Sequence, residues 1–140
     1  MYLCKKKKLM KKIIFSEKAP KAIGPYSQAV EYNGFVFVSG QLGINPETNM
    51  LVEGIENQTE QALKNLGAIL EAAGCTYEDV VKCTVLLDDM DNFKRMNDVY
   101  SKFFGQSPPA RAAFGVVRLP MGALVEIEAI AIKKKINNEH

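Results

Sequence analysis

The sequence is poor in the residues that most often carry acid–base and metal chemistry. Its one histidine is His140, the last of 140 residues, where nothing would hold the imidazole in place. Its three cysteines, at positions 4, 75 and 83, are odd in number and follow no metal-ligand spacing. We therefore expect no histidine-based catalysis, no disulfide framework, no metal site, and thiols that are reduced and structural.

Long hydrophobic runs are also absent. The longest apolar stretch falls far short of the roughly 20 residues that a membrane-spanning helix requires, so we expect no membrane partner. A chain of 140 residues, 47% hydrophobic, is long enough for one core and too short for two comfortable domains. We predict a single domain over residues 13–135, between an N-terminal extension at 1–12 and a C-terminal tail at 136–140.

Acidic residues are missing from the first twelve positions, which hold six lysines. We predict a disordered extension here, with contact to nucleic acid or acidic lipid as the alternative. No secretory signal or transit peptide is recognisable in it, which favours a cytoplasmic protein. Without those six lysines, the 18 basic residues fall to 12 against 16 acidic ones. This balance counts against a surface that neutralises many phosphates, so we do not expect a nucleic-acid partner.

The hydrophobic pattern predicts seven elements in the order β-β-α-β-α-β-β. They are a strand in 27–32, a strand at 35–40, a helix between Gly54 and Gly74, a strand at 80–87, a helix that begins after Asp91 and stops at Gly105, a strand after Arg111, and a strand at 124–132. This order is typical of an α+β fold in which two helices cover one face of a mixed sheet. The other face would then need a partner.

Arg111 stands between a proline pair and an apolar run. An arginine cannot lose its charge in a protein, so a desolvated guanidinium must meet a carboxylate, a phosphate or a set of carbonyls. The chain has only three arginines against fifteen lysines, which indicates that a planar, bidentate donor is needed here. A structural salt bridge is the alternative interpretation.

Two further polar residues occupy positions where the pattern calls for apolar ones. Asn97 follows Phe93 by four residues and precedes Tyr100 by three, which places it on the apolar face of its helix. It would either face a cleft or bond to a nearby loop. Glu126 and Glu128 share one face of the last strand, where they would be paired for acid–base work or form a solvated edge.

Six stretches of the sequence together resemble one family. They are APKAIGPYSQAV, FVFVSGQLGINPETN, TEQALKNLGAILEAAG, MDNFKRMNDVYSKFFG, PPARAAFGVVRLP and VEIEAIA. The chain resembles the reactive-intermediate deaminases (RidA, also called YjgF) from about Ile13 to Lys133. The resemblance implies a chorismate-mutase-like fold and a homotrimer with active sites between subunits. It also implies hydrolysis of enamines and imines, such as 2-aminoacrylate and related 2-imino acids, to 2-keto acids and ammonia without a metal or bound cofactor.

The resemblance also implies roles for single residues. Arg111 would pair with the carboxylate of the imino or enamino acid substrate. Glu126, and not Glu128, would orient or deprotonate the attacking water. The residues that would line the cleft beside them, partly from the neighbouring subunit, are Tyr26, Ser39, Gly40, Asn97 and Ala113.

Ala113 is a departure from the family pattern, because many members carry a cysteine two residues after the arginine. A mechanism that needs that thiolate is excluded, whereas the backbone carbonyl of residue 113 can still bind a water. Two other functions stay open. One is an endoribonuclease or translation inhibitor, which the acidic body and the lack of an aromatic stacking motif count against. The other is a trimer that binds a small acid without turnover.

Overall fold

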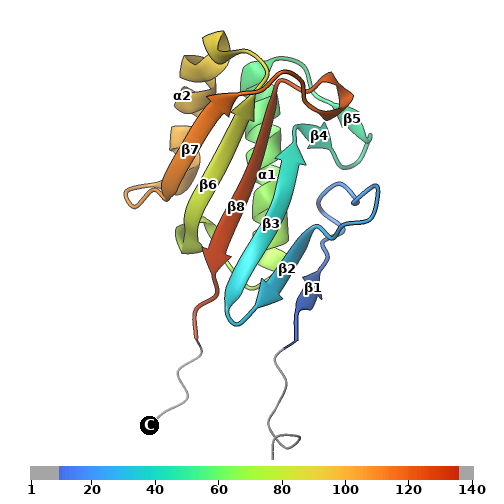
Figure 1. Ribbon diagram of the computed structural model, residues 1–140, viewed down its shortest axis with the longest axis vertical. Coiled ribbons are helices and arrows are strands. Elements are labelled where there is room, and N and C mark those ends of the chain that lie inside the picture. The colour runs from blue at the N-terminus through green and yellow to red at the C-terminus, as the bar shows by residue number, and fades with distance from the viewer. Residues whose placement is uncertain (1–9, 136–140) are drawn as a thin grey trace, which may run out of the picture.

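The computed structural model describes residues 10–135 (Figure 1). The C-terminal tail predicted at 136–140 and the first nine residues of the predicted extension lie outside this range. The helices and strands are β1 (Lys12–Ile14), β2 (Ala29–Tyr32), β3 (Phe35–Leu42), β4 (Ile44–Asn45), β5 (Met50–Leu51), α1 (Ile55–Ala72), β6 (Val80–Leu87), α2 (Phe93–Phe104), β7 (Ala110–Gly115) and β8 (Val125–Ile132).

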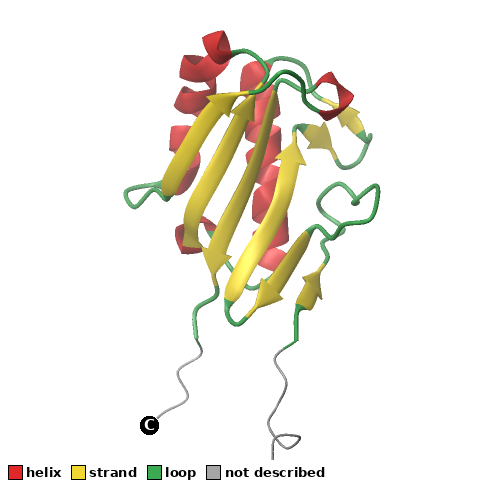
Figure 2. Cartoon of the chain, viewed as in Figure 1, coloured by secondary structure: helices red, strands yellow, loops and turns green. Residues whose placement is uncertain are grey.

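Six strands form one mixed sheet in the order β1-β2-β3-β8-β6-β7, and β4 pairs only with β5. The pairing is antiparallel throughout the six-stranded sheet except between β6 and β7, which run parallel and are joined through α2. Both helices lie behind the sheet in the view of Figure 2. The predicted α+β fold with two helices on a mixed sheet is therefore confirmed.

Alternation along the strands gives the sheet two different faces. In β8 the residues that pack toward the helices are Val125, Ile127, Ala129 and Ala131, all buried. On the other face, Phe37 pairs with Ile130 and Phe35 with Ile132, and 42–46% of each phenylalanine is exposed. We call this second side, which neither α1 nor α2 covers, the open face. Apolar side chains of this size in contact with water are typical of a surface that meets another molecule.

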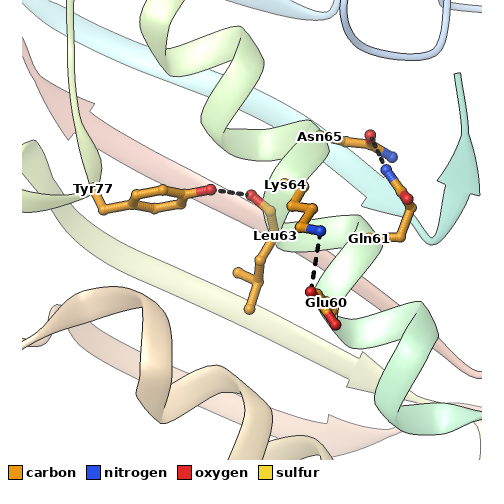
Figure 3. A network of polar contacts seen from close by, with 6 residues as sticks. All are labelled: Glu60, Gln61, Leu63, Lys64, Asn65 and Tyr77. Atoms are coloured by element: carbon orange, nitrogen blue, oxygen red, sulfur yellow. Dashed lines mark hydrogen bonds and ion pairs between the residues drawn. The ribbon is translucent and has the colours of Figure 1, made fainter.

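The core between the sheet and α1 contains the fully buried Leu63, Leu66 and Ile69. Tyr77 closes one end of it, where its hydroxyl donates to the carbonyl of Leu63 over 2.7 Å (Figure 3). This approach requires Gly67, because a Cβ there would collide with the Tyr77 hydroxyl. Burial raises the pKa of Tyr77 to about 12. Figure 3 also shows two polar pairs on α1: Lys64 forms an exposed ion pair with Glu60, which contributes little to stability, and Gln61 donates a hydrogen bond to the buried Asn65.

The structure contains three strands that the sequence did not predict. β1 has three residues and β4 and β5 have two each, too few for a periodic pattern to stand out. The boundary predicted between Lys12 and Ile13 is also displaced, because Lys12 already belongs to β1 and lies opposite Glu31 of β2. Lys12 is exposed on this edge strand, which explains why a lysine is tolerated there. Within residues 10–135, neither helix is long and apolar enough to cross a membrane.

Candidate active site

Arg111 is the second residue of β7, and its side chain turns toward α2. Its Nη1 donates a hydrogen bond to Oδ1 of Asn97 over 2.7 Å. The guanidinium carbon lies 4.7 Å from the ring centroid of Tyr100 and 5.5 Å from that of Phe93. These neighbours are neutral, and Arg111 forms no ion pair with any residue between 10 and 135. The structural salt bridge that the sequence left open is therefore absent from the described chain.

A hollow of about 400 Å³ opens beside Arg111. Its wall includes Asn97, Tyr100 and the pair Pro108–Pro109, which comes just before β7. Of the five N–H groups of the guanidinium, one has an acceptor in the described part of the chain. A guanidinium with N–H groups left over can bind a ligand that offers two oxygens side by side, as a carboxylate does.

Glu126 lies near the start of β8 on the open face, half-buried, whereas Glu128 is exposed. The Glu126 Oε2 occupies the place where a Cβ at Gly40 would have to stand. Gly40 belongs to an irregular part of β3, where the pairing with β8 shifts register between Val38 and Gln41. The lack of a side chain at residue 40 thus makes room for this carboxylate.

The environment of Glu126 favours its protonated form. Burial raises the pKa of the Glu126 carboxyl above its usual value, and the like charge of Glu128 raises it further. This carboxyl therefore changes its protonation state closer to neutral pH than an ordinary glutamate. Such a group is suited to take a proton from water and return it within one catalytic cycle.

A second hollow, of about 260 Å³, lies over Glu126. Tyr26 and Gly40 line it together with Glu126, while Ile23 and Met121 add apolar side chains from two loops. It has no lining residue in common with the hollow beside Arg111. The sequence did not indicate Ile23 or Met121, because their loops carry no periodic pattern.

The loop that carries Tyr26 is attached to the sheet by buried side chains. Gln28 accepts a hydrogen bond from the backbone N–H of Ser16 over 2.6 Å and donates to the Ser16 carbonyl over 3.1 Å. The Ser39 hydroxyl donates to the carbonyl of Ser27 over 2.6 Å. Ser39 thus holds the loop through this hydrogen bond. Its side chain lines neither hollow. Gln28 was missed because its partners are backbone groups distant in the sequence.

Ala113 lies in β7 opposite Val85 of β6 and packs against the core. Its methyl group lines neither hollow. Cys75 and Cys83 are buried as well, and burial raises the pKa of both thiols, which keeps them protonated and weakly nucleophilic. Among residues 10–135, no group of three or more His, Cys, Asp or Glu side chains is arranged to hold a metal ion.

Within one chain, the side chains of Arg111 and Glu126 lie on opposite sides of the sheet. Arg111 is in register with Cys83, which is buried on the helix side, whereas Glu126 is in register with Leu86 on the open face. The site residues therefore fall into two groups. We call Arg111, Asn97, Tyr100 and Phe93 the arginine half, and Glu126, Gly40 and Tyr26, with Ser39 behind them, the glutamate half.

Comparison with known proteins finds similarity over most of the chain. A family described as Endoribonuclease L-PSP matches residues 16–133. A RutC family protein of Pyrococcus horikoshii is 55% identical over 126 residues, which are 89% of this chain and 100% of that protein. A mouse protein named 2-iminobutanoate/2-iminopropanoate deaminase is 52% identical over 126 residues, which are 89% of this chain and 93% of the mouse protein.

A solved structure also has this fold. E. coli TdcF, crystallised with bound serine, superposes with a TM-score of 0.85 at 40% identity. The superposition covers 88% of this chain and 99% of TdcF. Both the sequence and the arrangement of elements are therefore shared with these proteins over nearly their whole length.

Proposed function

The chain belongs to the RidA family, described as Endoribonuclease L-PSP, and on this premise we propose that it hydrolyses reactive enamines and imines to 2-keto acids and ammonia. Mammalian relatives about half identical to it are named 2-iminobutanoate/2-iminopropanoate deaminases. The substrates would be 2-aminoacrylate and related 2-imino acids, all of which carry a carboxylate beside the reacting carbon.

One observation carries this proposal. Arg111 is a half-buried cation whose neighbours in the described chain are a neutral amide and two aromatic rings. A guanidinium in that setting needs an anion, and its position at the edge of a hollow suits a carboxylate. The TdcF structure contains serine, an amino acid with such a carboxylate, which is consistent with an anionic ligand here.

The reaction needs few protein groups, because an imine is already an electrophile. A proton from solvent adds to the methylene carbon of 2-aminoacrylate and gives the iminium. Water then adds to the C=N carbon and transfers one proton to Glu126, which gives the carbinolamine. Glu126 returns this proton to the nitrogen, the C–N bond breaks as the C=O bond forms, and the hydroxyl proton passes to the departing ammonia, so that pyruvate and ammonium leave. The protein supplies position through Arg111, charge complementarity, and one proton carrier through Glu126.

The complete site would lie between two copies of the chain. Because Arg111 and Glu126 face opposite sides of one sheet, the arginine half of one copy would meet the glutamate half of the next. Contacts between two different surfaces of identical chains form a ring where the rotation between copies closes, and we propose a ring of three. Such a ring would also cover the open-face side chains of Phe35, Phe37 and Ile130. Light scattering should then give three times the 15.5 kDa chain mass.

The decisive assay supplies 2-aminoacrylate from a serine dehydratase and follows its loss in the presence of the wild-type protein. We expect loss to accelerate with wild type and not with Arg111→Ala. An RNA substrate incubated in parallel tests the endoribonuclease function that the family description names. Cleavage of RNA without any effect on 2-aminoacrylate would refute the proposal in favour of that activity. Pyruvate binding without turnover would indicate a non-catalytic acid-binding protein.

A further inference from the structure

Tyr100 lies closer to the guanidinium of Arg111 than Phe93, the other aromatic ring of the described chain beside it. The Arg111 guanidinium carbon is 4.7 Å from its ring centroid, within the range in which a cation is attracted to an aromatic face. Only 5% of Tyr100 is exposed, and its ring packs against Phe104 with 4.8 Å between centroids. Packing in the core therefore fixes the position of the Tyr100 ring beside the guanidinium.

The hydroxyl of Tyr100 does not explain why a tyrosine stands here. It is buried close to the Cys83 thiol and the Arg111 guanidinium, but it makes no hydrogen bond of good geometry with either of them or with another described residue. Tyr77 differs, because its hydroxyl donates to the Leu63 carbonyl over 2.7 Å. A buried hydroxyl without a well-formed hydrogen bond is a cost, whereas the ring lies directly beside the guanidinium, so the ring is the part of Tyr100 that we expect to act on Arg111.

A single hydrogen bond cannot fix the orientation of Arg111. The bond to Asn97 holds one nitrogen and leaves the guanidinium free to rotate about that contact. Bidentate recognition of a carboxylate requires the plane and direction of the fork to be set in advance. The ring of Tyr100 supplies the missing restraint, because Phe93 is farther away, at 5.5 Å, and only half-buried.

We propose that Tyr100 is a positioning residue whose aromatic face sets the plane of the Arg111 guanidinium for the substrate carboxylate. This inference rests on the proposed function, since it assumes that Arg111 binds a carboxylate. Phe93, Asn97 and Tyr100 follow one another at intervals of four and three residues, so one side of α2 presents all three to Arg111. Tyr100 acts through Arg111 and touches no reacting atom.

The test compares Tyr100→Leu with Tyr100→Phe and uses pyruvate, the expected product, as the binding probe. The leucine variant keeps an apolar side chain and loses the aromatic face, so pyruvate should bind roughly three- to thirty-fold more weakly. The KM for 2-aminoacrylate should rise by a similar factor while kcat changes little. The phenylalanine variant keeps the face and should retain affinity within about twofold.

A core control separates positioning from a general loss of packing. Phe103→Leu removes an aromatic ring from the same helix, where Phe103 packs on Tyr77, whereas the rings beside the Arg111 guanidinium are those of Phe93 and Tyr100. Its unfolding temperature should fall, as that of Tyr100→Leu should, but its pyruvate affinity should equal that of wild type. If Tyr100→Leu behaves in the same way, or if Tyr100→Phe is as weak as Tyr100→Leu, the positioning role is refuted.

Fluorinated phenylalanines at position 100 keep the test valid even if Tyr100→Leu does not fold. Added fluorine weakens the negative face of the ring with little change in shape, so pyruvate affinity should fall stepwise with each fluorine. An affinity independent of fluorination would overturn the inference. Wild-type protein that neither binds pyruvate nor consumes 2-aminoacrylate would overturn the proposed function as well, whereas normal wild-type activity with insensitive variants would overturn the positioning role alone.

Discussion

The arginine half and the glutamate half hold their charges by different means. The Arg111 guanidinium donates a hydrogen bond to Asn97 and lies beside the aromatic rings of Tyr100 and Phe93. Glu126 sits in a space left by the missing side chain of Gly40 and is pushed toward its protonated form by burial. A group that binds substrate works best when its orientation is fixed in advance. A group that exchanges a proton works best when its pKa lies close to the working pH, so that both protonation states are populated.

The largest effect should come from Glu126→Gln, which keeps the shape of the glutamate half and removes its proton acceptor. Loss of a general base typically lowers turnover by roughly 100- to 10,000-fold. Pyruvate affinity should persist, because the arginine half is untouched. Steady-state kinetics and pyruvate titration of the same preparation check both statements. If pyruvate affinity and turnover fell by the same factor, the assignment of binding to the arginine half and of proton transfer to the glutamate half would be wrong.

Arg111→Ala and Arg111→Lys should produce the next largest effect, this time on binding. Losing a charge-assisted, bidentate contact in a partly desolvated site should cost about 2 to 5 kcal/mol, roughly thirty- to several-thousand-fold in kcat/KM. Lysine should not restore it, because an ammonium is a mobile point charge. Light scattering and thermal unfolding serve as controls. A variant whose assembly fails while its residual activity is normal would show that Arg111 is structural.

Gly40→Ala tests the glutamate half in another way, because it moves the Glu126 carboxylate without changing any charge. The new Cβ would displace the carboxylate, and a displacement of about 1 Å can cost roughly 100-fold in rate. The same substitution in a Glu126→Gln background is the matched control. It should change the rate much less there, since the group being displaced no longer acts. If Gly40→Ala lowered the rate equally in both backgrounds, the role of Gly40 would be to permit the local backbone conformation and not to make room for Glu126.

The smallest expected effect is a shift of the pH profile in Glu128→Gln. The raised pKa of Glu126 implies that kcat/KM falls as the pH drops through that value, because the base becomes protonated. Glu128 contributes to the shift by its like charge, so its removal should lower the pKa and move this acid limb to lower pH. Burial is the larger cause and should keep part of the shift. If the acid limb of the kcat/KM profile did not shift in Glu128→Gln, the protonation of a group other than Glu126 would control it.

The sequence predicted the elements with long periodic patterns and the face on which Glu126 lies. It identified Arg111 and Asn97 as polar residues in apolar positions, but each was considered alone. Their contact arises where α2 crosses the edge strand β7, which no local pattern encodes. The same is true of Gly40, whose neighbour Glu126 is distant in the chain. Tyr100 was assigned only to the apolar stripe of its helix, because a ring that packs and a ring that supports a cation give the same spacing.

The opposite orientation of Arg111 and Glu126 has a genetic consequence in the proposed ring of three. No subunit would use its own arginine and its own glutamate on the same substrate molecule. A ring that mixes an Arg111→Ala chain with a Glu126→Gln chain would always have one junction at which an intact arginine meets an intact glutamate. Two alleles that are each inactive alone would therefore complement one another in the same cell, so a null phenotype would depend on the pair of alleles inherited.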